Sequence, residues 1–132
     1  MTIRLFLLYW VPVIVYAGII VMFSSSSTPQ TYLPGWTGVI NDKVVHALEY
    51  AILAILCYRA FQHAAGPGLA EYAGFLGIVG AILFGISDEL HQYYVPLREA
   101  DPWDIVANAV GSLVGVTSWR QIRPRLHFFQ TP

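Results

Sequence analysis

The sequence has few charged residues and a single cysteine. Asp, Glu, Lys and Arg together make up 11% of its 132 residues, against about 25% in a typical soluble domain. Hydrophobic residues make up 56%, and a soluble chain of this length has too small an interior to bury so much apolar surface. Cys57 has no second cysteine to pair with, so an internal disulfide is excluded. The composition therefore excludes an ordinary soluble domain and indicates a membrane protein.

Four apolar runs have the length of membrane-spanning helices: 5–23, 44–61, 72–90 and 103–119. A spanning helix needs about 20 such residues, each adding about 1.5 Å. The first run is longer than the apolar core of a signal peptide, usually about 7–15 residues, so we expect it to be retained. Pro12 is expected to interrupt or kink it. The sequence thus predicts an all-α protein with one domain over residues 1–132, an integral membrane four-helix bundle.

Basic residues are distributed unequally between the two ends of the predicted bundle. Lys43 and Arg98 fall at one end, and the other five fall at the opposite end: Arg4, Arg59, Arg120, Arg123 and Arg125. Because Lys and Arg accumulate in cytoplasmic loops, we expect a multi-pass membrane protein with both termini in the cytoplasm. The acidic residues, except Glu71, fall toward the outer end.

The helix predicted over 44–61 opens with the polar segment NDKVVHALEY. Asp42 suits a helix N-terminus, because a carboxylate there meets unpaired backbone N–H groups. His46 and Glu49 share one helix face, and Glu49 lies about 9 Å deeper than Lys43. A charge at that depth is costly unless it is paired or faces water. We favour a functional role for His46 and Glu49, whereas a purely structural cap remains an open alternative for Asp42 and Lys43.

The helix predicted over 72–90 ends with the segment GISDELHQ. Asp88, His91 and Gln92 fall on one face together with a stripe of small residues: Gly74, Gly77, Ala81 and Gly85. Small residues at this spacing let helices approach closely, so this face is expected to meet another helix rather than lipid. Glu89 lies beside Gln92 on the neighbouring face. An ordinary solvated helix end is the alternative interpretation.

The helix predicted over 103–119 opens with DPWDIVANAVGSLVG. Asp101 is predicted to cap it and Pro102 to begin its first turn. Asp104 and Asn108 fall on one stripe with Gly111 and Gly115, which form a GxxxG packing motif. Asn108 lies one turn deeper than Asp104 and is expected to form a hydrogen bond across helices.

Three helices therefore present polar residues at one level, and Arg98 falls in the loop between two of them. This coincidence predicts a pocket that opens outward and is lined by carboxylate, imidazole, amide and guanidinium groups. Its predicted ligand-binding residues are Asp42, Lys43, His46, Asp88, Glu89, Gln92, Arg98, Asp104 and Asn108.

The segments DKVVHALEYAIL and DELHQYYVPLREADPWDIVANAVGSLVG resemble the VanZ-like family of small bacterial membrane proteins. The resemblance covers 42–115 and places most of the predicted pocket residues, together with Gly111 and Gly115, on the family pattern. His91 and Glu99 do not belong to that pattern. The founding member is associated with resistance to the glycopeptide antibiotic teicoplanin, so the resemblance implies the cell envelope and, for this chain, the bacterial cytoplasmic (inner) membrane. The family supplies no settled biochemical mechanism to carry over.

Three classes of function are compatible with these residues. The first is binding of the headgroup of a membrane lipid or of a lipid-linked cell-wall precursor, with Arg98 and Lys43 as phosphate contacts and Gln92 and Asn108 as hydrogen-bonding groups. The second is an enzyme acting on a lipid-linked substrate, in which His46 with Glu49 or Glu89 performs acid–base chemistry, although the motifs contain no Ser or Cys nucleophile.

The third class is a metal or proton site, with His46, Glu49, Asp88 and His91 as candidate ligands. A purely structural scaffold is a further alternative, but it does not explain why polar residues gather at one level. Because the predicted pocket opens outward, nucleic acid and cytoplasmic nucleotides are not expected as ligands. The sequence identifies neither a cofactor nor an oligomeric state.

Overall fold

A computed structural model describes residues 2–26, 42–96 and 100–128, with side chains as far as residue 124. The helices are α1 (Ile3–Leu5), a π-helical turn (Phe6–Trp10), α2 (Val11–Ser24), α3 (Asp42–Ala64), α4 (Pro67–Ala70), α5 (Ala73–Tyr93) and α6 (Pro102–Phe128). The first three are continuous and form one helix, Ile3–Ser24. The described chain therefore consists of four long helices and one short helix, which confirms the all-α prediction.

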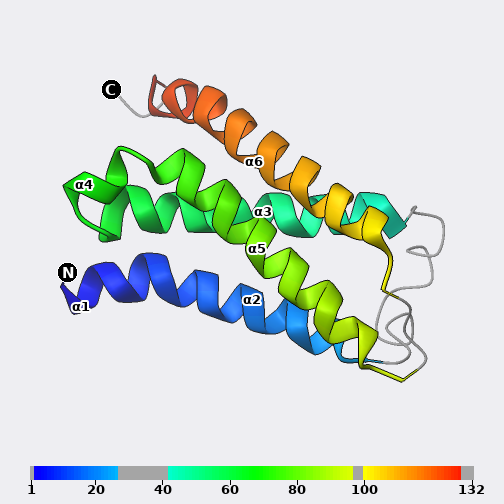
Figure 1. Cartoon of the computed structure of the whole chain (residues 1–132). Coiled ribbons are helices and arrows are strands. Elements are labelled where there is room, and N and C mark those ends of the chain that lie inside the picture. The colour runs from blue at the N-terminus through cyan, green and yellow to red at the C-terminus, as the bar shows by residue number, and fades with distance from the viewer. Residues whose placement is uncertain (1, 27–41, 97–99, 129–132) are drawn as a thin grey trace.

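Helix α3 lies at the centre of the bundle and contacts α2, α5 and α6 (Figure 1). Successive long helices run in opposite directions, so the start of α1 and the end of α6 lie at the same end. We call this the basic end, because it carries Arg4, Arg59, Arg120 and Arg123. The opposite end, where α3 and α6 begin and α2 and α5 end, is called the polar end.

Pro12 does not break the first helix, because a π-helical turn immediately precedes it. In that turn the Val11 N–H bonds to the Phe6 carbonyl, five residues earlier rather than four. Proline has no N–H, and its ring collides with the carbonyl four residues before it in a regular α-helix. A widened turn is one of the known ways in which a helix accommodates such a disturbance. The predicted interruption is thus a local change of helix type.

Glycines allow α3 to pack directly against the backbones of α5 and α6. A Cβ built on Gly77 of α5 would lie 2.8 Å from the Tyr58 nitrogen, and one on Gly115 of α6 would lie 2.7 Å from the Ala51 oxygen. These distances are too short for any side chain, so glycine is required at both contacts. The prediction that the glycine stripes are helix-packing surfaces is confirmed.

Three of the four long helices have the length and hydropathy of membrane spans: Ile3–Ser24, Asp42–Ala64 and Ala73–Tyr93. The chain is therefore a multi-pass membrane protein. Helix α6 is not among these candidates, because its inward face carries Asp104, Asn108 and Ser112. It also continues beyond the predicted residue 119 through the basic segment to Phe128, with Pro124 inside the helix.

Candidate functional site

The beginnings of α3 and α6 are joined through Lys43. Asp101 caps α6, because its Oδ1 accepts a hydrogen bond of 2.9 Å from the Trp103 N–H. Its other oxygen, Oδ2, accepts from Lys43 Nζ at 2.5 Å, and Lys43 also donates to Oδ1 of Asp104. The hydrogen bond from Lys43 holds the pKa of Asp101 below its usual range. Lys43 is thus shared by two carboxylates from the first turn of α6, and the predicted cap at Asp101 is confirmed.

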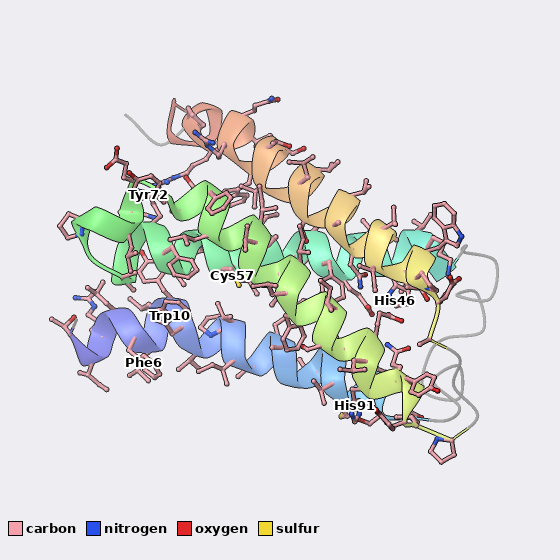
Figure 2. The ribbon with its side chains drawn as sticks, in the orientation of Figure 1. Phe6, Trp10, His46, Cys57, Tyr72 and His91 are labelled. Carbon is pink, nitrogen blue, oxygen red and sulfur yellow. The ribbon has the colours of Figure 1, made fainter. Side chains whose placement is uncertain are left out.

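His46 lies one turn deeper and faces α5 and α6 (Figure 2). Its Nδ1 is 3.2 Å from Oδ1 of Asn108 and 4.0 Å from Oε1 of Glu89. Its Nε2 is 3.7 Å from Oδ2 of Asp104 and 3.9 Å from Oδ2 of Asp42. Because an amide oxygen only accepts hydrogen bonds, Nδ1 is the nitrogen that carries a proton. Nε2 therefore faces two carboxylates.

Glu89 and Asn108 are buried in this cluster with unused hydrogen-bonding capacity. Glu89 is 3% exposed and Asn108 is 1% exposed. Among the described residues, no side chain donates to the carboxylate oxygens of Glu89, which have the backbone N–H of Asp101 as a neighbouring donor, and Nδ2 of Asn108 has no partner. Buried polar atoms without partners are rare in proteins, because each one costs free energy. We call the set Asp42, Lys43, His46, Glu89, Asp101, Asp104 and Asn108 the His46 cluster.

Asp88 and Gln92 belong to a separate network between α2 and α5. Asp88 Oδ1 accepts from the Ser24 hydroxyl at 2.6 Å, and its Oδ2 accepts from Gln92 at 3.1 Å and from the Tyr50 hydroxyl at 3.4 Å. Gln92 also donates to the Ser24 oxygen at 2.9 Å. We call these four residues the Ser24 network. They hold α2, α3 and α5 together at the polar end, and so Asp88 and Gln92 have a structural role there.

The remaining sequence candidates lie apart from the His46 cluster. His91, at the end of α5, is 3.0 Å from the hydroxyl of Ser25 at the end of α2 (Figure 2). The Ser25 hydroxyl also donates to the Val21 carbonyl at 2.6 Å. Glu49 is half-buried and lies near Tyr16 of α2. Arg98 falls outside the described residues.

The residues whose possible metal-ligand atoms lie close together differ from the set that the sequence predicted as metal ligands. In the part of the chain that the structure describes, one set of three such residues has ligand atoms within 4.8 Å of one another: Asp42, His46 and Asp104. Glu49, Asp88 and His91 are not members of this group. His46 belongs to both sets, but the sequence grouped it with carboxylates of α3 and α5, whereas the structure brings it next to Asp104 of α6.

Ser24 and Tyr50 form hydrogen bonds at the polar end that the sequence motifs did not indicate. Ser24 begins a run of four serines, a composition typical of an exposed linker, but it is buried and only 4% exposed. The available signal was its position directly after an apolar run, at the same end of the bundle as Asp88. The hydroxyl of Tyr50 is directed to Asp88 of α5.

Two cavities lie at the basic end of the bundle, away from the His46 cluster. One has a volume of about 280 Å³ and is lined by Tyr58, Arg120, Arg123 and Pro124. The other, of about 260 Å³, shares Tyr58 and Arg120 with it. Six of the nine residues predicted to line one pocket meet in the His46 cluster: Asp42, Lys43, His46, Glu89, Asp104 and Asn108.

The fold and the His46 cluster define a class of small helical membrane protein with charged groups buried at one end. Residues 3–123 match the family model described as VanZ/LLP1, and the chain belongs to this family. The match extends well beyond the 42–115 segment on which the resemblance was recognised. No curated protein and no solved structure matches the chain.

Proposed function

We propose that the protein binds the polar headgroup of an envelope lipid, or of a lipid-linked cell-wall precursor, at the His46 cluster. The observation that carries this proposal is the buried Glu89 carboxylate, whose two oxygens accept from no side chain among the described residues and have the Asp101 backbone N–H as a neighbouring donor. A headgroup with hydroxyl or amino donors satisfies those oxygens, and an acceptor on the same headgroup satisfies the Asn108 amide. Such pairing removes the cost of the unused polar groups.

The contacts of Lys43 refine this proposal. The sequence suggested Lys43 as a phosphate contact, but its ammonium group is held by Asp101 and Asp104. The cluster as a whole contains more carboxylates than cations, which favours a headgroup rich in hydrogen-bond donors. Arg98 stays a predicted anion contact. Holding a precursor at this level would also change the access of glycopeptide antibiotics to it.

Exposed aromatic residues near the polar end support a position at the membrane interface. Tyr93, Tyr94 and Trp103 are between 69% and 75% exposed. Tyr and Trp are enriched at the level of lipid headgroups, where the ring contacts acyl chains and the polar atom contacts water. The His46 cluster lies on the same part of α3, α5 and α6, within reach of a headgroup.

The headgroup proposal predicts reduced lipid retention by Glu89→Gln. The full-length protein, in nanodiscs made from total envelope lipid extract, is purified and its retained lipids are measured by mass spectrometry. We expect Glu89→Gln to retain the bound species at least about tenfold less, because hydrogen bonds to a charged acceptor contribute about 1.5–3 kcal/mol each. Glu71→Gln is the matched control, because Glu71 is exposed near the basic end.

Two results would contradict this proposal. Equal retention by the native protein and Glu89→Gln would remove the headgroup role of the cluster. Release of a chemically altered lipid by the native protein, lost in His46→Ala, would identify an enzyme instead. His46 Nδ1 and Glu89 Oε1 are 4.0 Å apart, which is the acid–base pair that such an enzyme would use.

We also propose that α6 is a fourth membrane span and that the basic end is cytoplasmic in a bacterial inner membrane. The polar side chains of α6 face inward, whereas Val110, Leu113 and Val114 are 53–54% exposed, as expected for a surface in contact with lipid. The arginines at the basic end support the orientation, because cytoplasmic ends accumulate basic residues.

Cysteine labelling in intact cells tests this orientation. Cys57 is first replaced by alanine, and single cysteines are introduced at Tyr94 and at Gly68, which are exposed at opposite ends. A membrane-impermeant maleimide is expected to label Tyr94→Cys and not Gly68→Cys until the membrane is permeabilised. The reverse pattern would overturn the orientation, and labelling of both in intact cells would overturn the bundle as a span.

A further inference from the structure

We propose that Asp42, His46 and Asp104 bind a divalent transition-metal ion of the zinc class. The three ligand atoms are Nε2 of His46, Oδ2 of Asp104 and Oδ2 of Asp42, and the two carboxylate oxygens lie 3.7 and 3.9 Å from the nitrogen. Metal–ligand bonds of about 2.0–2.2 Å place neighbouring ligand atoms of a tetrahedral site about 3.4 Å apart. The two edges from the nitrogen are within a few tenths of an ångström of this value. The third edge, between the two carboxylate oxygens, is at most 4.8 Å, and the exposed side chain of Asp42 can move to close it.

The tautomer of His46 supports a cation at this position. Nδ1 carries a proton because it faces the amide oxygen of Asn108 at 3.2 Å. With the proton on Nδ1, Nε2 is directed toward two carboxylates, and a cation at Nε2, whether a proton or a metal ion, removes the repulsion between these groups. Metal-binding histidines commonly show this pattern, with one nitrogen on the metal and the other donating to an oxygen acceptor that fixes the ring.

A second, independent observation is the buried carboxylate of Glu89. It is 3% exposed, accepts a hydrogen bond from no side chain among the described residues, and faces the same imidazole from the Nδ1 side at 4.0 Å. A carboxylate at this position stabilises the positive charge that a bound metal induces in the ring. The cluster contains four carboxylates and one lysine, which contacts two of them, so a divalent cation also offsets the local excess of negative charge.

The donor set indicates which ion fits. One imidazole nitrogen with two carboxylate oxygens is a mixed set that suits zinc-class ions better than Mg²⁺ or Ca²⁺, which prefer oxygen ligands alone. Oδ1 of Asp104 is held by Lys43, so Oδ2 is the oxygen directed to the metal. Three protein ligands leave a coordination position open. Asp42, with a side chain 72% exposed, places that position at the surface of the bundle.

The proposed site predicts the binding of one Zn²⁺ per chain. The full-length protein in detergent is stripped with a chelator and titrated with Zn²⁺ by calorimetry, and Co²⁺ is added separately to record its visible absorption. We expect Asp42→Asn and His46→Gln each to weaken binding by more than about tenfold, since loss of even the outer contacts of a metal site costs about 10–100-fold. His91→Gln, an imidazole at the same end outside the group, is expected to bind as the native protein does.

Asp42 is exposed at the first residue of α3, so Asp42→Asn tests the site without disturbing the core. Absence of saturable binding by the native protein would overturn the inference, and so would unchanged affinity in either variant. The inference does not rest on the proposed headgroup role. Lipid retention measured on chelator-treated protein tests that role separately, so either proposal fails without the other.

Discussion

Replacing Gly111 with alanine is expected to destabilise the protein by about 3 kcal/mol or more, the upper part of the range for overpacking a close helix contact. The new Cβ would collide with the carbonyl group of Ala47, lying 2.6 Å from its carbon and closer still to its oxygen. Both partners are backbone, so no side chain can rotate away. Thermal unfolding in detergent, followed by the loss of monodisperse protein, measures the effect.

Gly80→Ala is the matched control for this substitution. Gly80 also lies within a long helix, but a Cβ there meets nothing within 4 Å. We expect its midpoint of unfolding to equal or exceed that of the native protein, because alanine favours the helix by about 1 kcal/mol over glycine. If Gly111→Ala were as stable as Gly80→Ala, the close approach of α3 and α6 would be wrong.

Replacing Asp88 with alanine is expected to cost about 2–3 kcal/mol, the second largest effect. The substitution removes the acceptor used by Ser24, Tyr50 and Gln92. Hydrogen bonds between membrane helices contribute about 0.6 kcal/mol on average and up to about 1.7 kcal/mol each, and here three converge on one carboxylate. Asp88→Asn keeps an acceptor oxygen and is expected to lose less. Unfolding in a titration with denaturing detergent compares the variants.

Ser87→Ala controls for this change at the neighbouring position. Ser87 is exposed, and its hydroxyl donates to the Phe84 carbonyl of its own helix at 2.7 Å. Its loss is expected to change the free energy of unfolding by less than about 0.5 kcal/mol. An equal loss of stability in Ser87→Ala and Asp88→Ala would mean that the Ser24 network does not hold α2 against α5.

The apolar runs located α3 and α5 well, because a membrane-spanning helix needs a continuous apolar segment of defined length. The predicted runs 44–61 and 72–90 lie within one to three residues of the ends of α3 and α5. Depth along a helix follows from a constant rise per residue, so the common level of His46, Glu89 and Asn108 was also predictable. The glycine stripes indicated close packing before any partner was known.

The partners of the polar groups were not predictable in the same way. Asp88 and Glu89 are adjacent in the sequence and were assigned to one pocket, but a step of about 100° around the helix turns them toward different neighbours. Asp88 meets Ser24 of α2, whereas Glu89 faces His46 of α3. The helical phase determines that they diverge, but only the packing decides what each one meets.

Lys43 shows the same division between sequence and structure. The sequence by itself determined a cation at the start of a membrane helix, an acidic end of the bundle and the set of helices that present polar residues at one level. The tertiary structure alone decided that Lys43 is held by Asp101 and Asp104, which are 58 and 61 residues away, and that Asp42, His46 and Asp104 converge. The physical reason is that local spacing sets the face and depth of a side chain, whereas its neighbour and its net charge environment depend on which helix packs against that face.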